Sequence, residues 1–185
     1  LQEKKFLYEQ IEKLLEENGK IINNTYNQNN IHQTNNIVIK NYGDEDLSHL
    51  TQSVLDNLIS SPADMIRNLT TMIHFNKDKP ENMNMYIPSR KQKHIKVYRN
   101  NKWTYESKAL RIPDLIDRNY LILDSHFEDN GGSNRIPDTN NLHYKNYQKL
   151  LDQKNKKILK QEQEACEYAI LNNSDIVMDQ HKLKY

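Results

Sequence analysis

The chain of 185 residues has little of several features that usually reveal a class of function. It contains one cysteine, Cys166, which excludes an internal disulfide and a cysteine-based zinc site in this sequence and fits a reducing compartment. No apolar run approaches the roughly 18 residues that a membrane-spanning helix needs, and no signal-peptide core opens the chain. We therefore expect no membrane insertion.

The residue patterns of common catalytic and cofactor sites are also missing. The sequence has neither a glycine-rich phosphate-binding loop nor a Gly-x-Ser-x-Gly turn. Its seven histidines are scattered, and no two of them have the i, i+4 spacing of a metal site. His74 follows an apolar helical face and is interpreted as a hydrogen-bonded core or capping residue. Cys166 has no histidine near it in sequence. We expect no enzyme activity, no cofactor and no metal.

Composition points to a modest domain with extensions. Hydrophobic residues are 36% of the chain and the mean hydropathy is −0.97, both low for a globular protein. Such a chain contains segments that bury little surface, or that bury it only against another chain. The net charge is +1, so any attraction of nucleic acid must come from a local basic patch.

The N-terminal segment, residues 1–22, carries a heptad pattern. Apolar residues and one asparagine recur at alternating spacings of four and three, with isoleucine and asparagine at a positions and leucine at d positions. The seam consists of Leu7, Ile11, Leu14, Asn18 and Ile21. A buried asparagine at a favours a parallel dimeric coiled coil, with a trimer as the alternative. The other interpretation is an amphipathic helix packed on its own domain. Residues 23–36 are rich in asparagine and free of charge, which predicts a flexible spacer or strand pairing between chains.

A mixed α+β domain is expected over residues 37–129. We expect a strand at 37–39 and a helix introduced by Asp44–Asp46. A second helix should begin at Ser61 and Pro62, because serine suits the cap position and proline the first turn.

From Met83 the apolar period changes to two, which predicts three short antiparallel strands with Asn100-Asn101 as a tight turn of positive φ. A helix then follows, with Pro113 as a kink or a new start and Asn119 as a left-handed cap before a short last helix.

The C-terminal part is expected to be helical after a hinge. The glycine-containing loop 130–141 should be flexible, and residues 142–169 have the period of one long helix, followed by a tail of uncertain structure. The expected organisation is a coiled-coil helix at 1–22, a spacer at 23–36, the α+β domain at 37–129, the loop at 130–141, and the C-terminal helix and tail at 142–185.

The strongest local charge lies between positions 90 and 111, where eight basic residues accompany a single acid, Glu106. A tryptophan and two tyrosines are interleaved with them, and a basic β-surface with aromatic rings can hold phosphates and stack bases. The alternative is that the rings form the core of the sheet and the cations form its solvated side. The candidate nucleic-acid contacts are Arg90, Lys91, Lys93, Lys96, Arg99 and Lys102.

The region from Asn35 to Asp129 resembles a domain of uncharacterised proteins from nucleocytoplasmic large DNA viruses. The similar segments are NNIVIKNYGDEDLSHL, MIHFNKDKPENMNMYIPSRKQKHIKVYRNNKWTYESK and LIDRNYLILDSHFED. Many family members have glycine where this chain has Asn119. The resemblance implies a viral source and a location in the host cytoplasm, the viral factory or the virion. Family members often carry a zinc finger before the coiled coil, so one can be expected ahead of Leu1.

These observations favour a non-enzymatic, oligomeric viral interaction module that binds nucleic acid or acts as a regulator. Its expected partners are a second copy of the chain, DNA and other viral proteins. The alternative is a virion structural or scaffold protein, of the minor-capsid or cement type, whose spacer and helices thread between capsid subunits.

Overall fold

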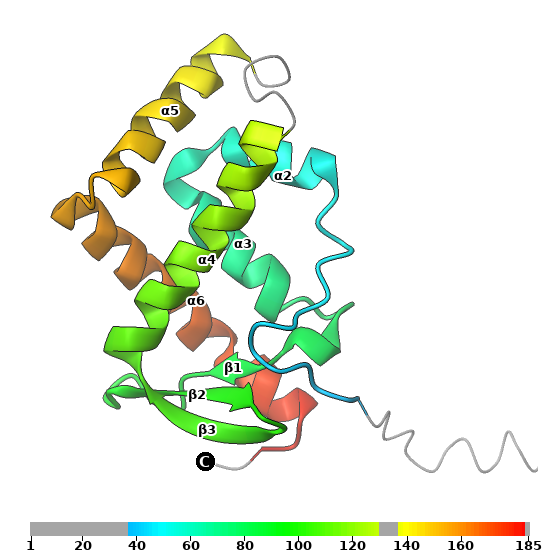
Figure 1. Cartoon of the computed structure of the whole chain (residues 1–185). Coiled ribbons are helices and arrows are strands. Elements are labelled where there is room, and N and C mark those ends of the chain that lie inside the picture. Colours follow the sequence, from blue (N-terminus) through cyan, green and yellow to red (C-terminus); the bar gives the residue numbers. More distant parts are fainter. Residues whose placement is uncertain (1–36, 130–136, 184–185) are drawn as a thin grey trace, which may run out of the picture. The chain divides into compact units, whose positions relative to one another are not determined.

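The computed structural model describes residues 37–129 and 137–183, which include five α-helices and a small antiparallel sheet (Figure 1). The helices are α2 (Gln52–Ile59), α3 (Pro62–His74), α4 (Lys108–Asp129), α5 (Asp138–Asp152) and α6 (Lys156–Gln180). The strands are β1 (Met85–Tyr86), β2 (His94–Arg99) and β3 (Lys102–Ser107), and a 3-10 turn, η1, covers Pro80–Asn82. The mixed α+β class is as expected, and most of the described residues in regular elements are helical. The predicted coiled coil and spacer lie outside the described residues.

The three-stranded sheet has the predicted antiparallel order β1-β2-β3. Asn100 and Asn101 join β2 to β3 with φ of 52° and 59°, as expected for a two-residue turn. The prediction of an alternating strand from Met83 is wrong. All residues from Met83 to Ile87 are buried, because α6 lies against β1 and the backbone N–H of Ile87 donates to Ser174 Oγ at 2.9 Å.

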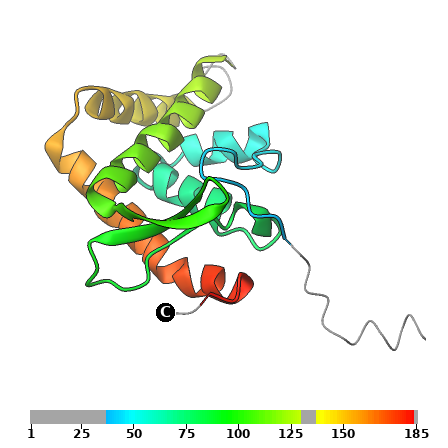
Figure 2. The same cartoon turned by 60° about the horizontal axis from the view of Figure 1, so that its bottom comes forward.

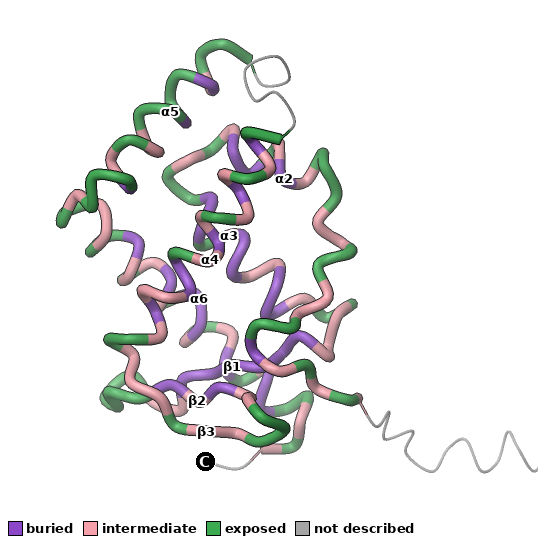
Figure 3. Tube along the Cα trace, in the orientation of Figure 1, coloured by how far each residue is buried: buried purple, intermediate pink, exposed green. Residues whose placement is uncertain are grey.

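Helix α3 lies at the centre of the fold and packs against α2, α4, α5 and α6. Its buried residues include Met65, Ile66, Leu69 and Ile73, as the apolar spacing predicted. Pro62 occupies the first turn as expected, although the side chain of Ser61 makes no capping bond. Figure 3 shows buried residues along α3, along β1 and on parts of α4 and α6. No helix in the described ranges is both long enough and apolar enough to cross a membrane.

Helix α4 is one element of 22 residues, so the expected cap at Asn119 and the separate last helix are wrong. Pro113 is inside the helix, but a buried stripe that includes Ile112, Ile116 and Leu123 continues through it. Asn119 is on this stripe, and its Nδ2 donates to Thr70 Oγ1 of α3 at 2.8 Å. Packing against α3 therefore overrides the two local signals that suggested an end.

The expected long C-terminal helix is two helices. Helix α5 begins at Asp138, within the segment expected to be a loop, and α6 continues to Gln180. Between them Lys154 has a φ of 49°, and the Oδ1 of Asn155 accepts hydrogen bonds from the N–H groups of Lys157 and Ile158. Asn155 thus begins a new helix that folds back onto α3 and β1.

The segment before α2 also differs from expectation. Residues 37–39 are not a strand, and the chain there is held by isolated bonds, such as the Tyr42 N–H to the Tyr98 carbonyl at 2.8 Å. Helix α2 begins at Gln52, with Thr51 as its cap, and residues 44–46 are not helical. The carboxylates of Glu45 and Asp46 make tertiary contacts instead.

Lys154, which has a positive φ between α5 and α6, leads to a prediction about the stability of the fold. A lysine with positive φ is strained by roughly 1–2 kcal/mol, whereas glycine adopts this conformation freely. We expect Lys154→Gly to raise the free energy of unfolding by about 0.5–1 kcal/mol, after the greater flexibility of the unfolded chain is subtracted. Urea denaturation measures the change.

The matched control is Gln161→Gly, at an exposed position inside α6, which should lower the free energy of unfolding by about 1 kcal/mol. Equal losses in both variants would contradict the assignment of the helix junction.

Candidate functional site

The register of the sheet divides its side chains between two faces. Residues alternate along a strand, and directly paired residues share a face. Lys96 pairs with Tyr86 and with Tyr105, Tyr98 pairs with Trp103, and His94 pairs with Ser107. Ile95 and Val97 lie on the opposite face and are fully buried in the core. We call the first set the outer face; it consists of Tyr86, His94, Lys96, Tyr98, Trp103, Tyr105 and Ser107.

Lys96 is at the centre of the outer face. Its Nζ lies 4.6 Å from the ring centroid of Tyr105 and 5.8 Å from that of Tyr86. Burial works to lower the pKa of Lys96, but the favourable interactions of its ammonium group with Tyr105 and Tyr86 outweigh it, so the pKa is raised above its usual value. Lys96 is therefore a fixed positive charge between two aromatic side chains.

The two tyrosines that flank Lys96 differ in exposure. Tyr86 is only 2% exposed, and its ring packs edge-on against Trp103 at 5.1 Å. Tyr105 is 63% exposed, with an edge contact to His94 at 6.4 Å. The outer face thus has a covered side near β1 and an open side on β3.

The C-terminal end of α6 covers part of the outer face. Figure 2 shows this end of the helix beside the sheet. The ring of His181 lies 6.0 Å from that of Trp103, and His181 Nε2 is 2.9 Å from the carbonyl oxygen of Met83. Burial lowers the pKa of His181. Trp103 is therefore a partly buried support rather than a free ring.

The six predicted basic residues do not share one face. Lys96 lies on the outer face, whereas Arg99 pairs with Lys102 on the other side of the sheet. Arg90, Lys91 and Lys93 are in the connection between β1 and β2, and all three are exposed.

Of these three exposed residues, Arg90 contacts a neighbouring side chain and Lys93 borders a cleft. Arg90 donates to the hydroxyl of Tyr168 at 3.3 Å and lies over its ring. Lys93 lines a cleft of about 380 Å³ with Lys108 and Glu167, and Lys108 is paired with Glu167 at 2.6 Å.

Three arginines surround one tyrosine at the edge of the sheet. Arg99, Arg111 and Arg118 lie 5.3, 5.0 and 4.5 Å from the ring centroid of Tyr42. These arginines are paired with acids: Arg99 and Arg111 with Glu106, Arg111 also with Asp114, and Arg118 with Glu45. Arg99 is thus grouped with Tyr42 and Glu106 rather than with Lys96.

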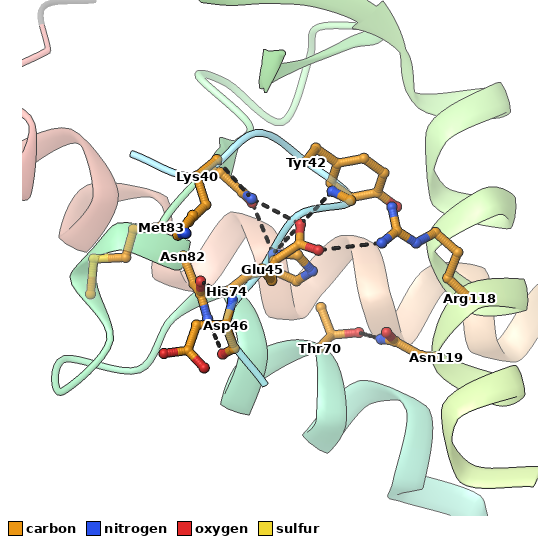
Figure 4. A network of polar contacts seen from close by, with 12 residues as sticks. Lys40, Tyr42, Glu45, Asp46, Thr70, His74, Asn82, Met83, Arg118 and Asn119 are labelled. Atoms are coloured by element: carbon orange, nitrogen blue, oxygen red, sulfur yellow. Dashed lines mark hydrogen bonds and ion pairs between the residues drawn. The ribbon is translucent and has the colours of Figure 1, made fainter. Parts of the chain in front are cut away.

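A buried carboxylate fastens the segment that contains Tyr42 (Figure 4). Glu45 Oε1 accepts hydrogen bonds from the Gly43 N–H at 2.9 Å and from Asn84 Nδ2 at 2.8 Å, and Oε2 lies 3.3 Å from Arg118. Gly43 has a φ of +107°, and a Cβ atom there would lie 3.1 Å from the Arg118 guanidinium. Burial works to raise the pKa of Glu45, but the interaction with His74 and the hydrogen bonds from Gly43 and Asn84 together keep it below its usual value.

His74, at the end of α3, completes this cluster. It is buried, its Nδ1 lies 2.9 Å from Asn84 Oδ1, and its ring stacks on Tyr42 at 5.9 Å. The interpretation of His74 as a hydrogen-bonded core residue is therefore confirmed. Burial lowers the pKa of His74, and the nearby charge of Glu45 only partly compensates.

A second set of bonds holds the same segment further along. Asp46 pairs with Lys79 at 2.6 Å, and Asn82 Nδ2 donates to the carbonyl oxygen of Asp46 at 2.8 Å. The Lys79 hydrogen bond is the main cause of the lowered pKa of Asp46. The acids expected to introduce a helix therefore attach the segment before α2 to the rest of the fold.

Reactive groups elsewhere are buried or isolated. Cys166 is fully buried beside Thr70, and burial raises its pKa to about 12, so the thiol stays protonated near neutral pH. In the part of the chain that the structure describes, no three His, Cys, Asp or Glu side chains gather as a metal site would require.

The buried cluster gives a pH prediction. Below pH 6.5, the usual pKa of histidine, the unfolded chain binds a proton on His74 that the folded chain does not bind. The free energy of unfolding therefore falls as the pH drops below 6.5. At pH 5 the loss from His74 is at most about 2 kcal/mol, since each pH unit contributes about 1.4 kcal/mol. Below pH 4.5, protonation of Glu45 should weaken the fold in the same direction.

Thermal unfolding between pH 7 and pH 5 measures the effect. We expect His74→Gln, which can still bond Asn84, to flatten the dependence of the melting temperature on pH. His181→Gln should flatten it less, and His143→Gln, at an exposed position on α5, should leave it unchanged. An unchanged slope in His74→Gln would contradict the prediction.

No protein-family model matches the chain, and neither does any curated protein or solved structure.

Proposed function

We propose that this chain is a non-enzymatic, oligomeric interaction module of a nucleocytoplasmic large DNA virus that binds nucleic acid on the outer face of its sheet. The observation that carries the proposal is the position of Lys96 between Tyr86 and Tyr105, on a face whose seven strand positions include no carboxylate. A fixed cation beside aromatic rings matches the phosphate and the base of a nucleotide.

The surroundings of Lys96 support this choice over the rest of the basic run. Arg99 and Arg111 both lie beside the carboxylate of Glu106, Arg111 is also paired with Asp114, and Lys102 lies on the other side of the sheet. Lys91 and Lys93, which are exposed just before β2, can extend a path for the phosphate backbone beyond Lys96.

A domain that binds nucleic acid weakly on its own binds it more tightly when several copies are linked in one oligomer. In the proposal this link is a coiled coil, with a parallel dimer favoured. Its seam consists of Leu7, Ile11, Leu14, Asn18 and Ile21. Two outer faces on one nucleic-acid strand would then bind more tightly than either alone, because the second contact becomes intramolecular.

A matched pair of variants tests the binding face. Lys96→Met keeps the aliphatic packing but removes the charge, and Lys102→Met does the same on the opposite face. In fluorescence anisotropy with labelled DNA across a salt series, we expect Lys96→Met to weaken binding several-fold and to reduce the salt slope by about one. Lys102→Met should leave both values near those of the parent chain.

Equal effects of the two substitutions would contradict the assignment of the outer face. Absence of binding at low salt would remove the nucleic-acid function. That result would favour the virion scaffold alternative, which the abundance of the protein in purified particles tests.

The oligomeric part has its own test. We expect the full chain to sediment as a dimer, and Leu14→Lys to sediment as a monomer, because a charge at a d position disrupts the seam. Asn18→Leu, which keeps the seam apolar, should remain oligomeric and can shift the number of copies. A monomeric mass for the parent chain would overturn this part of the proposal.

A further inference from the structure

We infer that the nucleic acid bound by the outer face is single-stranded, with a base stacked on the ring of Tyr105 and its phosphate held by Lys96. This inference rests on the proposed function and names the class of ligand. Three features support it: Tyr105 is the exposed ring of the outer face, Lys96 lies beside that ring, and a duplex offers no free base to stack on it.

The rings of the outer face are not equally available. Tyr86 is covered, and Trp103 lies between Tyr86, Tyr98 and the His181 ring of α6. Tyr105 is on β3 at the edge of the sheet and is 63% exposed. It is therefore the best-placed ring for a flat ligand on this face.

Tyr105 also has the neighbours that a nucleotide requires. Lys96 Nζ lies over one face of the Tyr105 ring, 4.6 Å from its centroid, so a base stacks on the opposite face and the ammonium group is close enough to attract the phosphate of the same nucleotide. The ring of His94 is nearly perpendicular to Tyr105, at 87°, and forms a wall beside it. Both residues come from β2, so the central strand supplies the polar contacts and the edge strand supplies the stacking ring.

The same arrangement does not suit a duplex. Bases within a duplex are already stacked on one another, and proteins reach only their edges, through the grooves. A stacking ring on a sheet needs bases that are unpaired and splayed out, which single strands provide. The open part of the outer face lies on β2 and β3, whose backbones are about 4.8 Å apart, so it is narrow and suits a few nucleotides rather than the width of a double helix.

Binding of the full-length chain to three labelled probes tests the inference. The probes are a 15-nucleotide oligo(dT), the duplex of that strand with oligo(dA), and a backbone of equal length without bases, each at the same low salt concentration. We expect binding to oligo(dT) to be at least about tenfold tighter than to either other probe, because stacking contributes only when a free base is present. Oligo(U) is measured in parallel, and tight binding of either single strand supports the inference.

Variants identify the ring. Tyr105→Ala should abolish the preference for oligo(dT) over the base-free backbone, and Tyr105→Phe, which keeps the ring, should retain it. The control is Tyr168→Ala, which removes an exposed tyrosine from α6 and should leave the preference intact. Circular dichroism confirms that each variant is folded.

The outcomes separate the two proposals. Equal affinity for single strand and duplex, or an unchanged preference in Tyr105→Ala, would overturn the single-strand inference while leaving nucleic-acid binding in place. Failure to bind any of the probes would overturn the proposed function itself.

Discussion

The two-residue period of the β2–β3 hairpin is the constraint on which the rest of this structure depends. Asn100 and Asn101 adopt positive φ, which sets Arg99 opposite Lys102 and therefore fixes every pair that follows. Ile95 and Val97 are placed in the core, and Lys96 is placed beside Tyr105 on the outer face. A shift of one residue would exchange these sets, burying a lysine and exposing two aliphatic side chains.

Much of this part of the fold could be predicted from the sequence. The asparagine pair and the alternation on either side of it are local signals, and α3 has both a proline in its first turn and a regular apolar face. Even the pairing of Lys96 with Tyr105 follows by counting outward from the turn. What local patterns could not show is that Tyr86 joins the same row, because β1 has only two residues and pairs through tertiary packing.

The errors have a common physical cause, which is that contacts between distant residues override local signals. Asp44, Glu45 and Asp46 form a typical acidic start of a helix, but their segment is more stable when Glu45 binds Asn84 and Arg118 and Asp46 binds Lys79. Asn119 has the residue type of a cap, but Thr70 satisfies its amide inside the helix pair. The partners of these residues lie about 30 to 75 positions away in the chain, so sequence spacing carries no trace of them.

Pairing, rather than the number of cations, decides which part of the basic run can act on a ligand. The guanidinium groups nearest Tyr42 are matched by Glu106, Asp114 and Glu45, so an incoming phosphate would have to displace a carboxylate already in place. Lys96 has the rings of Tyr86 and Tyr105 as neighbours instead, which attract its ammonium group without cancelling its charge. A chain with almost no net charge can therefore present one uncompensated cation at a chosen place, and it is this local difference that makes the outer face the functional candidate.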